Sequence, residues 1–303
     1  MKKVNWQKTV GYLIPIVIFY FLFRSIGENF SLISDYDFDF KIFHLILSVI
    51  FVFFNSVLAA VILKYFFKHF GFYLSFLDML RVYSLSQLAK YIPGGVWLYL
   101  LRFRFLNKRV SKESFIAVSA LENIVYVLSG LILAFFVSLR IFTTIPQRAA
   151  ALAMCLVILI FLFRVKWFYF FVDKAMKFFK SSGELNYQRI GRGPLFITLF
   201  GSTLNWILVG IGFFFFVSSF LQVNYGMLPW FVAVFAASVT AGYIFIIAPG
   251  GLGVREGIMV LLLQSVFGLE VATVIAVATR LWAVVSESFI AGLITLFSKN
   301  NLK

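Results

Sequence analysis

Six long apolar runs constrain this chain more than any other feature of its sequence. They lie near residues 10–26, 42–67, 113–139, 149–172, 194–222 and 270–297. A helix needs about 20 mostly apolar residues to cross a bilayer, which each run approaches or exceeds. The composition, with 62% hydrophobic and 13% charged residues, also departs from that of soluble domains. We therefore predict an all-α polytopic integral membrane protein with six full spans.

Two further apolar regions, 72–106 and 226–268, are each interrupted by the tripeptide Pro-Gly-Gly. In the first region only eight residues separate Pro93 from Arg102. They make about 12 Å of helix against a hydrocarbon core of about 30 Å, so we predict a re-entrant hairpin there. In the second region the limbs are about 21 and 17 residues long, which leaves open either a re-entrant hairpin or two full crossings.

Basic residues predict the sidedness of the chain. Of the 27 Lys and Arg residues, 20 fall on one side if each broken region leaves the membrane where it entered. The positive-inside rule makes that side cytoplasmic, with both termini inside, in a bacterial or archaeal inner membrane. The basic loop 164–192 is expected to contact the anionic lipid surface. Nucleic acid is not an expected partner, because no binding motif accompanies the net charge of +15.

The order span, span, hairpin, span occurs twice. Pro93 and Pro249 are 156 residues apart, and Asn123 and Arg280 are 157 apart. Three crossings per half give the two halves opposite orientations. We predict one membrane domain over 1–303, built as an inverted repeat of about 10–140 and 149–297. Many secondary transporters bind their substrate between such repeats, at broken helices near the midplane.

The broken helices have a physical use. Proline ends one half-helix, and glycine lets the backbone turn and approach a ligand closely. The next half-helix then presents free N–H groups and its positive dipole end, to which an anion binds well. Arg255 and Arg280 could add charge-assisted bonds to a phosphate. Lys90, Arg102 and Arg104 are interpreted as interfacial anchors whose charged ends reach water.

These residues also carry a family resemblance. The stretch "KYIPGGVW" followed by Arg102, and "APGGLGVREG" followed by "ATRLW", resemble the transmembrane region of the lysylphosphatidylglycerol synthase family, also called flippase-like domain proteins. Two-domain members pair this region, thought to flip aminoacylated phospholipid, with a C-terminal transferase that uses aminoacyl-tRNA. The chain ends at Lys303, soon after its last span, so the resemblance implies a stand-alone member without the synthase domain.

The resemblance also implies which residues bind the lipid headgroup. Glu122 matches the glutamate of a Glu-Arg pair that is common in the family. Asn123 stands here in place of the arginine. The other matching residues are Pro93, Gly94, Gly95, Pro249, Gly250, Gly251, Gly253, Arg255, Glu256 and Arg280. An alternative interpretation is that the Arg and Glu residues among them, together with Glu287, neutralise one another inside the helix bundle.

The leading functional hypothesis is a lipid translocase that binds a phospholipid or a polyprenyl-phosphate-linked lipid with a charged headgroup at the paired Pro-Gly-Gly hairpins. It expects no catalytic residue, metal or cofactor. One alternative is a membrane glycosyl or lipid-modifying transferase that uses Asp35, Asp37 and Asp39 of the loop "DYDFDF". Another is an accessory subunit of an envelope lipid or polysaccharide pathway. A homo-oligomer and an envelope-biosynthesis partner are both left open.

Overall fold

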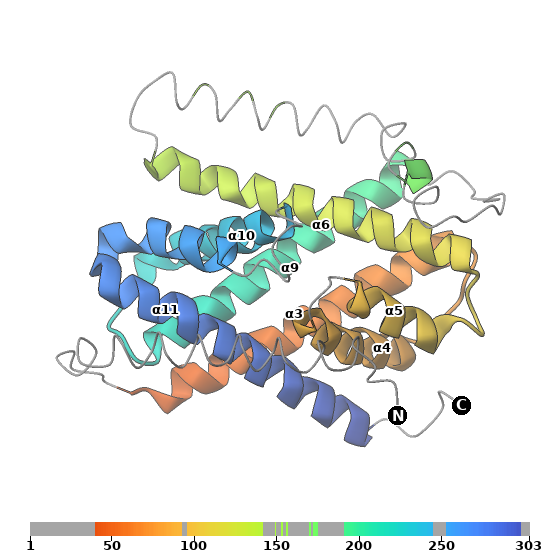
Figure 1. Ribbon diagram of the computed structural model, residues 1–303, viewed down its shortest axis with the longest axis horizontal. Helices are drawn as coiled ribbons and strands as arrows, with labels where there is room; N and C mark the ends of the chain where they lie inside the picture. The colour runs from red at the N-terminus through yellow and green to blue at the C-terminus, as the bar shows by residue number, and fades with distance from the viewer. Residues whose placement is uncertain are drawn as a thin grey trace, which may run out of the picture.

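A computed structural model describes the chain over residues 40–92, 96–141, 191–244 and 253–297, with a few isolated positions between 149 and 174. Over these ranges the chain forms helices joined by turns and contains no strand (Figure 1). The predicted all-α class is therefore confirmed for the described residues.

Three long helices match predicted spans. They are α3 (Ile42–His69), α6 (Lys112–Ile141) and α9 (Arg192–Ser218), with 28, 30 and 27 residues. At about 1.5 Å per residue each is longer than a hydrocarbon core of about 30 Å. The predicted spans at 10–26 and 149–172 lie outside the continuous described ranges, so the full count of six stays a prediction.

Short helices occupy the first broken region. They are α4 (Phe76–Leu88), the 3-10 turn η1 (Ala89–Tyr91) and α5 (Trp97–Leu106). The 13 residues of α4 and the 10 of α5 make about 20 and 15 Å of helix, too short to cross a bilayer. The hydroxyl of Ser75 begins α4 by accepting the Asp78 N–H at 3.1 Å.

The second broken region begins with η2 (Tyr225–Met227) and α10 (Leu228–Ile244), then continues into α11 (Val254–Phe297). Gly268 divides α11 with φ 81° and ψ 165°, a conformation that is almost restricted to glycine. The parts 254–267 and 269–297 are therefore separate helices, and 269–297 matches the last predicted span. Counted with η2, Tyr225–Ile244 has 20 residues, enough by length and composition to cross.

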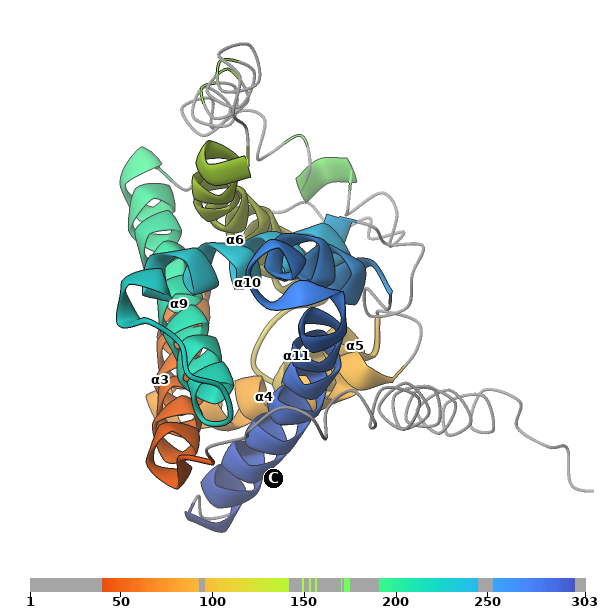
Figure 2. The ribbon, with the colours of Figure 1, turned by 90° about the vertical axis from the view of Figure 1, so that its left-hand side faces the viewer.

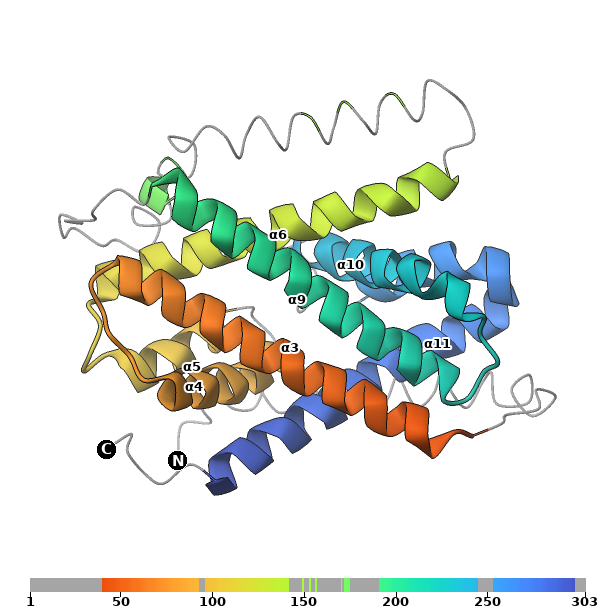
Figure 3. The ribbon, with the colours of Figure 1, turned by 180° about the vertical axis from the view of Figure 1, so that it is seen from behind.

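The helices of the two broken regions pack on long helices. In chain order residues 40–141 form α3, α4, α5 and α6, and residues 191–297 form α9, α10 and the two parts of α11. The helix α10 packs on α6, and α4 packs on α11. The long helices α3 and α9 lie against each other and run in opposite directions (Figures 2 and 3). The helices α4 and α5 lie at the opposite end of the bundle from α10 and 254–267 (Figure 1).

Two buried tryptophans form hydrogen bonds between helices. The indole N–H of Trp206 on α9 donates to the Tyr126 carbonyl of α6 at 3.1 Å, and that of Trp282 on α11 donates to the Ser48 hydroxyl of α3 at 3.0 Å. These bonds fix how the long helices face one another, because an unpaired indole N–H in the core would be costly.

The outer surface of the bundle is apolar. Among the large hydrophobic side chains exposed on the long helices are Phe43, Ile46, Phe54, Ile197, Phe200, Val285, Phe289, Leu296 and Phe297. A soluble monomer rarely exposes so large a contiguous apolar surface, whereas a bilayer solvates it. Five described helical segments are long and apolar enough to cross a membrane. The chain is a multi-pass membrane protein.

Candidate functional site

The helix that follows the second Pro-Gly-Gly begins with one half of a capping box, the bond from Glu256 back to the backbone. Gly253, at φ +81°, is the residue before α11, and its carbonyl accepts the Gly257 N–H at 2.8 Å. One carboxylate oxygen of Glu256 accepts the Gly253 N–H at 2.8 Å. Its other oxygen accepts from Arg280 Nη1 at 2.6 Å. Glu256 thus joins the start of α11 to residue 280 in the last helix.

The first half contains the same kind of link with its charges exchanged. Here the cation, Arg102, lies on the short helix α5 and donates from Nη1 to Glu122 on α6 at 2.6 Å. Its Nε also donates to the Ser86 hydroxyl on α4 at 3.2 Å. Each half therefore ties the helix after its Pro-Gly-Gly to the following long helix by one Arg–Glu pair.

A third ion pair joins the two halves. Glu287 on α11 accepts from Lys90 Nζ at 2.6 Å and from the Tyr91 hydroxyl at 3.1 Å, both in η1. Tyr91 comes two residues before the first Pro-Gly-Gly. The last helix of the second half is consequently held to η1 of the first broken region.

Arg255 differs from the other cations in this region because it makes no salt bridge with a described residue. Its guanidinium lies 5.2 Å from the centroid of the Phe235 ring, and its Nη2 is buried without a hydrogen-bond partner there. Glu256, Arg280, Tyr91 and Glu287 are close enough to act on it electrostatically. A cation in the first turn of a helix also opposes the helix dipole, so Arg255 does not stabilise its own helix.

Tyrosines lie around these ion pairs. Tyr243 on α10 is close enough to Glu122, Glu287 and Arg255 to interact with them electrostatically. Its ring packs edge-on against Tyr126 at 5.4 Å. We use the name central polar cluster for these charged residues and tyrosines: Lys90, Arg102, Arg255, Arg280, Glu122, Glu256, Glu287, Tyr83, Tyr91, Tyr99, Tyr126 and Tyr243.

The cluster brings together the four charged residues that the sequence singled out, Glu122, Arg255, Glu256 and Arg280. Three of them are in ion pairs, which agrees with mutual neutralisation for Glu122, Glu256 and Arg280 but not for Arg255. The predicted residues 93–95 and 249–251 lie outside the described residues, as does the loop with Asp35, Asp37 and Asp39. Their proposed roles stay predictions.

The interpretation of Arg102 as an interfacial anchor was wrong. Its side chain is 1% exposed and is bonded to Glu122, whereas Arg104 on the same helix is exposed. Arg102 and Arg104 are two positions apart, which places their side chains about 200° apart around the helix axis. The two side chains therefore point in nearly opposite directions. The spacing of Arg102 and Arg104 in the sequence could therefore have indicated that one of them faces the inside of the bundle. The five tyrosines carried no comparable signal, because aromatic residues occur throughout this sequence.

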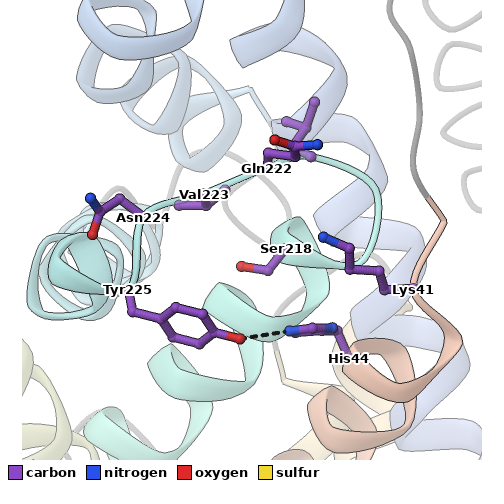
Figure 4. A pocket seen from close by; sticks show the side chains of 8 residues that line it. Lys41, His44, Ser218, Gln222, Val223, Asn224 and Tyr225 are labelled. Atoms are coloured by element: carbon purple, nitrogen blue, oxygen red, sulfur yellow. Dashed lines mark hydrogen bonds between the residues drawn. The ribbon is translucent and has the colours of Figure 1, made fainter.

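A separate polar pocket lies where α3 begins and α9 ends (Figure 4). It has a volume of about 510 Å³. His44 Nε2 and the Tyr225 hydroxyl are 3.0 Å apart across it, and the buried Ser218 hydroxyl has no partner in the described residues. The pocket does not include any residue of the central polar cluster. Among the described residues no group of three His, Cys, Asp or Glu side chains is arranged to hold a metal ion.

Comparison with known proteins agrees with the motifs. A family model described as the lysylphosphatidylglycerol synthase TM region matches residues 9–289. No curated protein and no solved structure matches the chain.

Proposed function

Because the chain belongs to the lysylphosphatidylglycerol synthase TM region family, we propose that it translocates a lipid with a charged headgroup across the membrane. The lipid is a phospholipid or a polyprenyl-phosphate-linked lipid. Its headgroup binds in the central polar cluster, between the two Pro-Gly-Gly tips.

The proposal takes the two halves as an inverted repeat and both broken regions as re-entrant hairpins. Three observations support this architecture. The helices of the two halves correspond in order, α4 and α5 are too short to cross, and the exchanged packing of α10 on α6 and α4 on α11 is what a pseudo-two-fold axis gives. In such transporters one half moves against the other and exposes the midplane site to each side in turn.

The cation of Arg255 carries the proposal. A buried charge without a carboxylate partner is expensive inside a membrane, and such residues commonly mark ligand pathways. Arg255 lies four residues after Gly251 of the second Pro-Gly-Gly motif and near Glu287, which is bonded to Tyr91, two residues before the first motif. A phosphate between the tips would accept bidentate bonds from its guanidinium, as planar arginine favours.

The lipid changes sides when the contacts between the halves exchange. In the described arrangement Lys90 and Tyr91 hold Glu287, and so hold the first broken region against the last helix. If the contacts between the halves break on one side of the membrane, the headgroup can leave toward that side. The chain offers no nucleotide-binding motif to drive the movement.

The test is lipid translocation by the purified protein in vesicles. Phosphatidylglycerol with a fluorescent acyl chain is placed in the inner leaflet, and its appearance outside is followed by chemical quenching. Arg255→Gln is expected to slow translocation at least tenfold. Arg104→Gln, which removes an exposed arginine of α5, is the matched control and should leave the rate unchanged. Equal rates for the wild type and Arg255→Gln would refute the role given to Arg255.

A further inference from the structure

The charge balance of the central polar cluster indicates which headgroups fit it. We propose that the cluster selects lipids whose headgroup carries one net negative charge and hydrogen-bonding oxygens, such as a phosphodiester with free hydroxyls, over zwitterionic and cationic lipids. This inference rests on the proposed function, because it names the substrate class of the same site.

The cluster contains one more cation than it has carboxylates. Each of the three carboxylates is bonded at 2.6 Å to its own cation. Arg255 is the fourth cation. Among the described residues no further carboxylate is bonded to Arg255. The tips 93–95 and 245–252 contain no Asp or Glu.

One additional negative charge makes the cluster neutral. In a medium of low dielectric constant an uncompensated charge is much more costly than in water. A monoanionic phosphodiester therefore gains its full attraction to Arg255 without leaving a new charge unpaired. A zwitterionic headgroup leaves the excess positive charge in place, and a cationic headgroup increases it.

The charge argument separates this chain from the aminoacylated phospholipid that two-domain members of the family are thought to flip. A phospholipid aminoacylated with lysine carries two ammonium groups and one phosphate, so its net charge is positive. Bringing it beside Arg255 would add a second unpaired cation to the cluster. The carboxylates that could receive an ammonium group, Glu122, Glu256 and Glu287, are already bonded to protein cations.

The tyrosines supply partners for the uncharged part of the headgroup. The Tyr91 and Tyr99 hydroxyls donate to Glu287 and Asn123. The hydroxyls of Tyr83, Tyr126 and Tyr243 make no hydrogen bond to another described residue. A phenolic hydroxyl both donates and accepts, so three such groups match a headgroup that carries hydroxyls.

The experiment compares three lipids with the same fluorescent acyl chain in vesicles of neutral phosphatidylcholine. Phosphatidylglycerol has a charge of −1, phosphatidylethanolamine is zwitterionic, and lysyl-phosphatidylglycerol is cationic. The wild type is expected to translocate phosphatidylglycerol at least tenfold faster than the other two. In Arg255→Gln the cluster has no excess charge, so the ratio of phosphatidylglycerol to phosphatidylethanolamine rates should fall below threefold. Arg104→Gln should keep the wild-type ratio.

Lipid retention is measured in parallel by native mass spectrometry on protein equilibrated with an equal mixture of the three lipids. This second measurement separates the two proposals. Selective retention of phosphatidylglycerol that is lost in Arg255→Gln, without translocation of any lipid, would support the charge selection and refute the translocase. Translocation or retention of lysyl-phosphatidylglycerol or phosphatidylethanolamine as efficient as that of phosphatidylglycerol would refute the charge selection, whatever the outcome for transport.

Discussion

Replacing Arg102 with methionine is expected to destabilise the protein strongly. The side chain is 1% exposed, donates to Glu122 at 2.6 Å and donates to the Ser86 hydroxyl at 3.2 Å. Breaking a buried ion pair from one side costs about 3–5 kcal/mol, because the remaining charge is left unpaired.

The size of the loss in the free energy of unfolding depends on how exposed Glu122 is once Arg102 is gone. The Glu122 side chain is 20% exposed, so part of its charge stays solvated and the lower end, about 3 kcal/mol, applies. The lost bond to Ser86 adds about 1 kcal/mol. We expect a total loss of about 4 kcal/mol in the free energy of unfolding. The double variant Arg102→Met, Glu122→Gln should recover about half of this, since no unpaired carboxylate remains.

The assay is reversible unfolding in mixed micelles with increasing sodium dodecyl sulfate, followed by tryptophan fluorescence. Arg104→Met is the matched control, because this arginine lies on the same helix and is exposed. Its free energy of unfolding should change by less than about 0.5 kcal/mol. A loss below about 1 kcal/mol for Arg102→Met, or a double variant no more stable than the single one, would show that the pair does not hold α5 to α6.

Three further outcomes are expected. Gly268→Ala should lower the free energy of unfolding by about 1–3 kcal/mol, because φ is +81° there. Gly257→Ala in the helix 254–267, with open space around the added Cβ, should not lower the free energy of unfolding. Gly210→Ala should cost about 1–3 kcal/mol, since its Cβ would lie 2.7 Å from the backbone of α10; an unchanged melting temperature would contradict such close packing. In a variant without Cys155, expressed in intact cells, Asn107→Cys should resist a membrane-impermeant thiol reagent and Gln222→Cys should react with it. The reverse pattern would refute the predicted sidedness.

The sequence predicted most of the described helices. The spans at 42–67, 113–139, 194–222 and 270–297 correspond to α3, α6, α9 and the second part of α11. The end of the second broken region at 268 coincides with the glycine that divides α11. Hydropathy works well here because a membrane helix must be apolar along its whole length, and glycine and proline mark where it stops.

The candidate site was predicted only in part. Arg255, Glu256, Arg280 and Glu122 were identified from their motifs, but which carboxylate meets which cation was not. Arg102 was given a different role, because a basic residue near the end of an apolar run has the same sequence signature whether it faces water or the core. The burial of its side chain decides between the two.

The sequence by itself determined that the chain enters the membrane and where its long apolar helices lie. These properties depend on local hydropathy and on glycine and proline, which act within one segment. Only the tertiary structure decided the charge pairing. Lys90 and Glu287 lie 197 residues apart along the chain and meet at 2.6 Å, and their meeting depends on how α4 packs on α11. Arg255 has no carboxylate partner among the described residues because that packing, and not the sequence around it, assigns every nearby carboxylate to another cation.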